Sequence, residues 1–237
     1  MTEFSPAADR MGGLKVKSSL SPAGLAVYLA RQLNVAYPDD NPVEVDDIMP
    51  AVPNALARLE HCFCEIDNKY FFDGESVVFN HLHGDQYAAW LYFISNEIFL
   101  QGGDTSVCSK IFLLNKACHG CDIYFEVALP SIFLLVHPLG SVLGRGSYGD
   151  YFVCYQSCGI GSNKDIYPVL GRHVTLRPGS LVLGSSVVGD FCQLGAGTLA
   201  LDMALETGTT LLGRPGSYRR LANPRPYPLW RRFKQEP

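Results

Sequence analysis

An aliphatic residue and a small residue recur with a period of six between Leu170 and Leu199. Such a period fits neither an α-helix nor an ordinary β-strand and is typical of a parallel β-helix built from hexapeptides. The pattern therefore predicts a triangular coil in which the aliphatic residue points inward and the small residue lets the chain turn the corner. The inward positions are Leu170, Leu176, Val182, Val188 and Leu194, and the small ones are Val174, Ser180, Ser186, Cys192 and Thr198.

Before residue 120 the apolar positions follow helical spacing instead. Ser21, a candidate N-cap followed by Pro22, precedes an apolar stripe that stops at Pro38. Further helices are predicted within residues 54–66, 81–103 and 105–118, and the acidic, proline-containing segment 39–53 is predicted to be a surface connection. We expect an α+β fold with an N-terminal helical domain (1–120), a parallel β-helix (121–213) and a short, basic C-terminal tail (214–237).

The hexapeptide pattern is weaker on both sides of its regular stretch. Weak hexapeptides extend upstream towards Asp122, and the phase fades again after Leu199. The period breaks once, between Ser162 and Tyr167, where we predict a loop that projects from a corner of the coil. A loop that leaves a regular scaffold is a common place for functional residues.

Composition and charge restrict the class of protein. The chain has 237 residues, of which 47% are hydrophobic and 18% charged. This length and hydrophobic content are sufficient for a buried core. No apolar run approaches the roughly 18 residues of a membrane span or resembles a signal peptide, so a cytoplasmic protein without membrane contact is expected. The formal charge of −4 is unevenly distributed, because the tail after Gly213 is basic, with seven basic residues and one acidic residue. Because this tail lacks repeated aromatic residues, we expect it to be solvated or packed on a partner, and we expect no nucleic acid.

The eight cysteines stand at irregular spacings. Without an export signal they are expected to be reduced, and we predict small buried side chains at all eight positions. Cys118 and Cys121 form a CxxC motif and Cys62 and Cys64 a CxC motif, but neither has a second ligand pair at zinc-finger spacing. No metal is expected.

Three motifs carry a family resemblance. Asp122-Ile123 is followed fifteen residues later by His137 in the segment VHPLGSVLG; then come YQSCGIG at 155–161 and LGRPGS at 212–217. The order of these motifs, together with helices that precede hexapeptide coils, resembles that of serine acetyltransferase and its relatives among the left-handed β-helix acyltransferases. The resemblance covers about residues 84 to 217. The resemblance implies a left-handed coil, acetyl-CoA as acyl donor, a small-molecule acceptor with a hydroxyl or amino group, and a homotrimer, either alone or paired into a dimer of trimers.

The resemblance also assigns roles to residues. His137 would be the general base and Asp122 the carboxylate that orients it. An alcohol or amine that attacks a thioester must lose a proton, and an imidazole, with an ordinary pKa of about 6.5, can accept it at neutral pH. A positioned base typically contributes about 10² to 10⁴ in rate. Backbone amides near Gly159 to Gly161 are candidates for stabilising the oxyanion.

Coenzyme A is expected in a groove between the coils of neighbouring subunits, where small residues permit a close approach to the backbone. A hexapeptide coil demands small residues with or without a ligand, so coil geometry explains the glycines equally well. Gln156 and Tyr167 are candidate contacts of the acceptor. The candidates for coenzyme A are Gly161, Gly179, Ser180, Gly195, Ala196, Arg214 and Pro215.

Two departures from the family pattern bear on the acceptor. Val136 stands where the family has an Asp before the catalytic His, and Ile166-Tyr167 stand where it has an Arg-His pair. These groups hold the charges of serine, and unpaired buried charges are costly. The sequence therefore favours another acceptor, such as an amino or deoxy sugar on a nucleotide carrier or a surface polysaccharide unit.

Two alternatives stay open. A γ-type carbonic anhydrase shares the coil architecture, but it needs three zinc-binding histidines and the repeat region offers only His137 and His173. A non-catalytic hexapeptide subunit that serves assembly is the other alternative, and the spacing of Asp122 and His137 argues against it.

Overall fold

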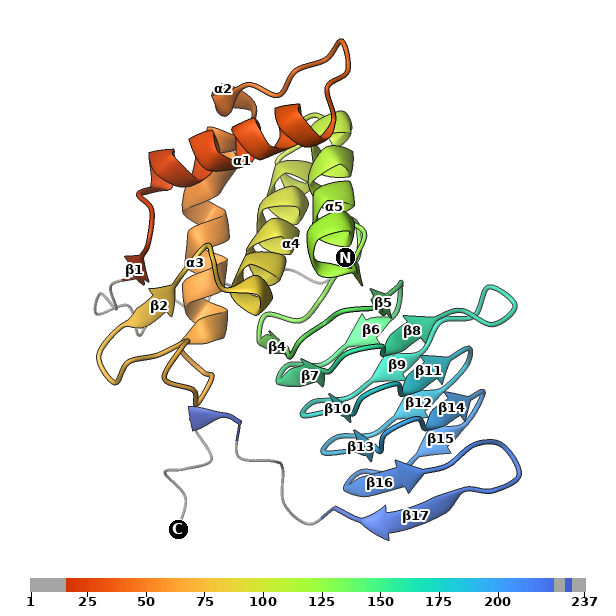
Figure 1. Ribbon diagram of the computed structural model, residues 1–237. Coiled ribbons are helices and arrows are strands. Elements are labelled where there is room, and N and C mark those ends of the chain that lie inside the picture. The colour runs from red at the N-terminus through yellow and green to blue at the C-terminus, as the bar shows by residue number, and fades with distance from the viewer. Residues whose placement is uncertain (1–15, 224–228, 232–237) are drawn as a thin grey trace.

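The computed structural model describes residues 16–223 and 229–231. A bundle of helices is followed by a parallel β-solenoid with three faces, and the helices stand at one end of the solenoid (Figure 1). These findings confirm the predicted α+β fold, with helices first and hexapeptide coils second. No helix among the described residues is long and apolar enough to cross a membrane.

The helical part agrees with the apolar spacing of the sequence. The N-cap Ser21 accepts a hydrogen bond from the Gly24 N–H, as predicted. α4 is buried on nearly all sides, which explains why its sequence is apolar almost throughout. The helices are α1 (Pro22–Ala36), α2 (Val45–Ile48), the 3₁₀-helix η1 (Met49–Ala51), α3 (Val52–Phe63), α4 (Gly84–Leu100) and α5 (Thr105–His119).

Two features of this part differ from the prediction. The segment 39–53 is more than a surface connection, because it forms α2 and η1 and buries Ile48 and Ala51 in the core. A short parallel pair, β1 (Val16–Ser18) with β2 (Val77–Phe79), was not predicted. Three residues are too few to display the alternation of a strand.

The solenoid is made of three parallel sheets. One consists of β4 (Phe133–Leu135), β7 (Phe152–Cys154), β10 (Thr175–Leu176), β13 (Gln193–Leu194) and β16 (Thr209–Leu212), to which β17 (Arg219–Ala222) adds antiparallel. The second consists of β3 (Cys121–Asp122), β5 (Ser141–Leu143), β8 (Gly159–Gly161), β11 (Leu181–Leu183) and β14 (Leu199–Leu201). The third consists of β6 (Ser147–Tyr148), β9 (Val169–Leu170), β12 (Val187–Val188) and β15 (Ala204–Leu205).

The interior of the solenoid follows the period of six. All five predicted aliphatic positions are buried, and so are all five small positions. The series of inward positions continues around the coil through Ala200, Leu205 and Leu211, which are also buried, so the coil extends past the point where the phase fades. The step from Ala200 to Leu205 is one residue short, which accounts for the lost phase.

Aromatic contacts join the helices to the first turns of the solenoid. The rings of Phe93 in α4 and Phe133 in β4 lie 5.2 Å apart. In the tail, Trp230 is buried and forms an isolated antiparallel β-bridge with Ile66. The Arg231 guanidinium lies 3.6 Å from the centre of the Phe72 ring. The prediction of a solvated or partner-bound tail is therefore wrong for these residues; Arg225, Arg232 and Lys234 lie outside the described residues.

All eight cysteines are free thiols. Six are buried, whereas Cys64 is half-buried and Cys118 is exposed, so the prediction of burial at all eight positions is wrong for these two. Cys118 lies near the end of α5, where the helix surface faces solvent. Among residues 16–223 and 229–231, no group of three His, Cys, Asp or Glu side chains is placed to hold a metal ion.

Candidate active site

Most of the predicted site residues lie along one corner of the solenoid, where the sheet of β4 turns into the sheet of β5. We call it the His137 corner; it comprises residues 136–140, 155–158, 177–180, 195–198 and 213–216. Backbone hydrogen bonds connect its successive turns, for example from the Gly179 N–H to the Gln156 carbonyl (3.0 Å) and from the Gly197 N–H to the Pro178 carbonyl (2.9 Å). The predicted residues on it are His137, Gln156, Gly179, Ser180, Gly195, Ala196, Arg214 and Pro215.

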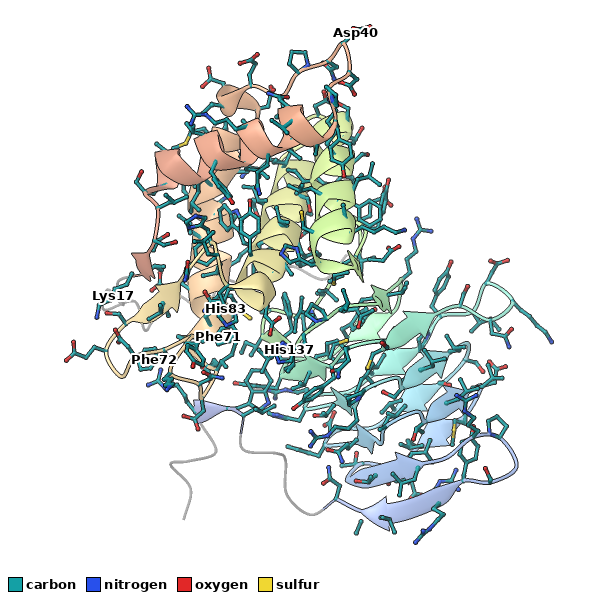
Figure 2. All side chains as sticks on the ribbon, viewed as in Figure 1. Lys17, Asp40, Phe71, Phe72, His83 and His137 are labelled. Carbon is teal, nitrogen blue, oxygen red and sulfur yellow. The ribbon has the colours of Figure 1, made fainter. Side chains whose placement is uncertain are left out.

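His137 lies at the start of this corner. Its backbone is in the left-handed region (φ 48°), and its carbonyl accepts a hydrogen bond from the Leu139 N–H at 2.7 Å. The side chain is 79% exposed. Figure 2 shows it between the lower end of α4 and the first strands of the solenoid. The imidazole is therefore open to a substrate at the junction of the two parts of the molecule.

The partner of this imidazole differs from the one that the resemblance implies. Asp85 Oδ2 lies 3.5 Å from His137 Nδ1 and accepts the His137 backbone N–H at 3.1 Å. Asp122 ends β3 opposite Val142, and its Oδ2 lies 2.7 Å from Lys116 Nζ of α5. Within the described chain, Asp85 is thus the carboxylate beside the His137 imidazole, and Asp122 forms an ion pair with Lys116.

The glycines and small residues of the corner fall into two groups. Gly179 has a left-handed backbone (φ 72°). A Cβ built on Gly179 would meet only Gly197 atoms, at 3.8 Å, so the space that a side chain would occupy there is open. Ala196, Arg214 and Pro215 are exposed beside it.

The second group is explained by the coil itself. Ser180 is fully buried, with its Oγ 3.6 Å from Cys158 Sγ. A Cβ on Gly195 would meet the Leu212 side chain. Coil packing therefore accounts for small residues at Ser180 and Gly195 without a ligand.

Gly161 and Tyr167 lie on a different corner. The loop predicted from the break in the period is present between β8 and β9, and Asn163 and Ile166 exchange backbone hydrogen bonds of 3.1 Å at its neck. Gly161 stands at its base, and Tyr167 is 38% exposed. Within one chain, the loop and His137 are on separate corners of the triangle.

One of the proposed oxyanion donors, the Gly159 amide, is engaged in the coil. The Gly159 N–H donates to the Ser180 carbonyl at 3.0 Å, and the Gly161 carbonyl accepts from the Gly184 N–H at 3.0 Å. The Gly159 amide is therefore not available to an oxyanion in this arrangement.

Gln156 brings an unmatched polar atom to the His137 corner. Its side-chain Oε1 is buried and has no hydrogen-bond partner among the described residues. Beside it, Arg177 Nη1 donates to the Tyr155 hydroxyl at 3.2 Å, and the guanidinium lies 5.2 Å from the centre of the Tyr155 ring. Buried polar atoms usually have partners, so Gln156 is suited to bind a ligand that supplies a donor.

Asp85 and Arg177 are the charged groups that the sequence pattern did not single out. Asp85 stands in the first turn of α4, where an acidic residue is ordinary helix chemistry. Arg177 occupies a hexapeptide position that gives no signal of its own. Only the packing of the helices on the solenoid, and the stacking of one turn on the next, could reveal them.

The chain is similar to serine acetyltransferases in both sequence and fold. No family model matches it. It is 28% identical over 108 residues to the serine acetyltransferase of Synechococcus elongatus, a match that spans 44% of this chain and 44% of that protein. The match thus covers less than half the length of this curated relative.

Solved structures with the same fold include three serine acetyltransferases. The soybean enzyme complexed with serine has a TM-score of 0.65 at 17% identity, covering 84% of each chain. The Brucella abortus strain S19 enzyme has a TM-score of 0.64 at 17% identity, covering 85% of this chain and 83% of that one. Isoform 3 from Entamoeba histolytica in complex with cysteine has a TM-score of 0.58 at 16% identity, covering 78% and 68%. At these identities the likeness shows the fold, and with the sequence match it confirms the resemblance to serine acetyltransferases.

Proposed function

We propose that the protein is a coenzyme A-dependent acyltransferase that moves an acetyl group from acetyl-CoA to a hydroxyl or amino group, with His137 as general base. The observation that carries the proposal is the open imidazole of His137 at the start of a corner along which Gly179, Ala196 and Arg214 follow. The similarity to serine acetyltransferases supports the same reaction class.

The chemistry needs one positioned base and no covalent acyl-enzyme. The acceptor oxygen or nitrogen attacks the thioester carbonyl while its proton passes to the imidazole. Collapse of the tetrahedral intermediate breaks the carbon–sulfur bond, and the proton then returns to the departing thiolate of coenzyme A. Because the side chain of His137 is largely exposed, both substrates can reach it.

Coenzyme A would lie along the His137 corner. Gly179 leaves space for the pantetheine chain, and Ala196 and Pro215 are exposed further along. The exposed guanidinium of Arg214 is suited to pair with a phosphate group. Gly161, on the next corner, would line the same groove from a neighbouring subunit.

We further propose a homotrimer, either alone or paired into a dimer of trimers. Aliphatic side chains face outward on two sheets, with Val142 49%, Val169 45% and Val187 49% exposed. Contact between neighbouring solenoids would cover these faces. It would also bring the loop with Tyr167 from one subunit towards His137 of the next, since the two lie on different corners of one chain.

The acceptor is proposed to be a small molecule other than free serine. Ile166 is 52% and Tyr167 38% exposed, so an apolar side chain and a phenol stand where a serine carboxylate would need cations. Tyr167 and the unpartnered Gln156 Oε1 suit the hydroxyl and amide groups of an amino or deoxy sugar, carried on a nucleotide or a surface polysaccharide unit. The eight free thiols agree with a reducing, cytoplasmic location.

A thiol-release assay tests the proposal. The purified protein is incubated with acetyl-CoA and a panel containing L-serine and nucleotide-linked amino sugars, and released coenzyme A and acetylated products are measured. We expect release with a sugar acceptor and little with serine. Acetyl-CoA binding and release that stay at background with every acceptor would overturn the proposal and favour the non-catalytic assembly subunit.

A further inference from the structure

The carboxylate of Asp85 contacts His137 at two points, although 52 residues separate them in the chain. Oδ2 accepts the backbone N–H at 3.1 Å and lies 3.5 Å from the ring nitrogen Nδ1. We propose that Asp85 is the positioning residue of His137, fixing both its backbone and the tautomer of its imidazole. The proposal rests on the function proposed above, in which His137 is the general base.

The two ring nitrogens would then have different tasks. A carboxylate beside Nδ1 favours the tautomer in which Nδ1 carries the proton, which leaves the lone pair on Nε2. Nε2 is the nitrogen that takes the acceptor's proton, and the negative charge of Asp85 stabilises the imidazolium that results. The separation of 3.5 Å is long for a hydrogen bond, as is common for catalytic pairs before a substrate binds.

Asp85 is itself held firmly. It stands in the first turn of α4, where the helix dipole favours a negative charge, and α4 is buried along nearly its whole length. Its side chain is only 15% exposed, against 79% for His137. One side of the imidazole therefore faces a fixed carboxylate, and the other side is open to a substrate.

The surrounding charges assign the two nearby carboxylates to different partners. Lys116 neutralises Asp122 at 2.7 Å. Burial lowers the pKa of His119 while the charge of Asp85 opposes this, and burial raises the pKa of Cys121 to about 12 with Asp122 and Asp85 acting in the same direction. Lys116 thus pairs with Asp122, whereas the imidazole that Asp85 Oδ2 approaches, at 3.5 Å, is that of His137.

Two matched variants test the proposal, Asp85→Asn and Asp122→Asn. Nitrogen-15 NMR of histidine-labelled protein reports the tautomer of His137, assigned by the signal that disappears in His137→Gln. We expect Asp85→Asn to shift the tautomer balance away from protonated Nδ1. It should also lower kcat by about 10- to 100-fold while leaving KM for acetyl-CoA unchanged, because the carboxylate acts through the base. Asp122→Asn tests the rival carboxylate, and its effects on the tautomer and on kcat should both be smaller than those of Asp85→Asn.

Controls separate positioning from folding. Asp85→Ser retains a side-chain oxygen at the start of α4, so it serves if Asp85→Asn unfolds, and Asp40→Asn on an exposed loop should behave as wild type. An unchanged tautomer and kcat in a folded Asp85 variant, with both altered in Asp122→Asn, would overturn the proposal. The NMR signal needs no turnover, so a chain without transferase activity would refute the proposed function and still report whether Asp85 sets the tautomer.

Discussion

The imidazole of His173 is stacked on the ring of Phe191, with ring centroids 4.6 Å apart and planes inclined by 6°. Its other face stacks on Tyr151 at 4.3 Å, and Trp230 of the tail packs edge-on against Tyr151 at 5.2 Å. The three stacked residues occupy equivalent left-handed positions on successive turns, with φ between 56° and 65°. The third corner of the solenoid, distinct from the His137 corner and from the loop corner, is thus an aromatic column that extends to Trp230.

This column predicts a pH dependence of stability. Burial lowers the pKa of His173 to about 4; Arg172 acts in the same direction, while Asp190 and Asp150 oppose it. The unfolded chain takes up the proton near a pKa of about 6.5, so the folded protein loses stability as pH falls from about 6.5 to about 4. After discounting for partial exposure, we expect His173 to account for about 1 to 2 kcal/mol of this loss.

Urea unfolding of the wild type and of His173→Phe measures the effect. The variant keeps a ring in the column but cannot be protonated, so the difference in unfolding free energy between about pH 7 and about pH 4.5 should be smaller than in wild type. His61→Phe, on the exposed surface of α3, is the control and should leave the pH profile unchanged. Equal pH profiles for wild type and His173→Phe would contradict the prediction.

A methyl group at Gly179 separates a ligand-binding role from coil geometry. Gly179→Ala places a side chain on a left-handed residue (φ 72°), at a cost of about 1 to 2 kcal/mol, but its Cβ meets nothing closer than 3.8 Å. Gly208→Ala on the aromatic corner has the same φ of 72° and comparable space. Both variants should lose similar stability in thermal unfolding, whereas only Gly179→Ala should raise KM for acetyl-CoA. An unchanged KM would remove Gly179 from the proposed coenzyme A groove.

The period of six predicted the solenoid because, between Leu170 and Leu199, aliphatic side chains fill the narrow interior along the faces and small residues occupy the corners. The pattern faded near Leu199 for a local reason. Between Ala200 and Leu205 the coil drops one residue, and Asp202 makes the turn with φ 49° while its Oδ1 accepts the Ser185 N–H at 2.9 Å. The turn at Asp202 is thus one residue shorter than a regular hexapeptide, and the side-chain hydrogen bond of Asp202 stabilises it.

Contacts between distant segments could not be predicted from local patterns. The spacing of fifteen residues predicted His137, yet the carboxylate beside it, Asp85, comes from a helix that packs against the solenoid. The same spacing pointed to Asp122, which the structure pairs with Lys116 only six residues away. A sequence pattern shows which residues share a face, but which carboxylate reaches a given imidazole depends on how the helices dock.

The ion pair of Arg58 and Glu97 holds α3 against α4. The nitrogen–oxygen distance is 3.1 Å, and Glu97 is only 7% exposed. Burial works to raise the pKa of Glu97, but hydrogen bonds from Asn54, Gln101 and Arg58 outweigh it and hold the pKa below its ordinary value. Arg58→Met should therefore destabilise the protein by about 3 kcal/mol, because it leaves a buried carboxylate without its cation.

A double variant tests the reason for that loss. Arg58→Met combined with Glu97→Gln removes both charges, so urea unfolding should show most of the stability recovered. If the double variant is as unstable as the sum of the two single variants, the loss comes from packing of the Arg58 side chain over Phe93 and not from the unpaired charge.

Removing the imidazole of His137 is the most direct test of the chemistry. His137→Ala should lower kcat by about 10² to 10⁴, the usual contribution of a general base. Circular dichroism and calorimetric binding of coenzyme A should stay as in wild type, because the side chain is 79% exposed and packs little of the core. His61→Ala, exposed on α3, controls for loss of a histidine elsewhere. Turnover close to wild type in His137→Ala would exclude the base role, whereas loss of both turnover and coenzyme A binding would show that His137 serves to bind the donor.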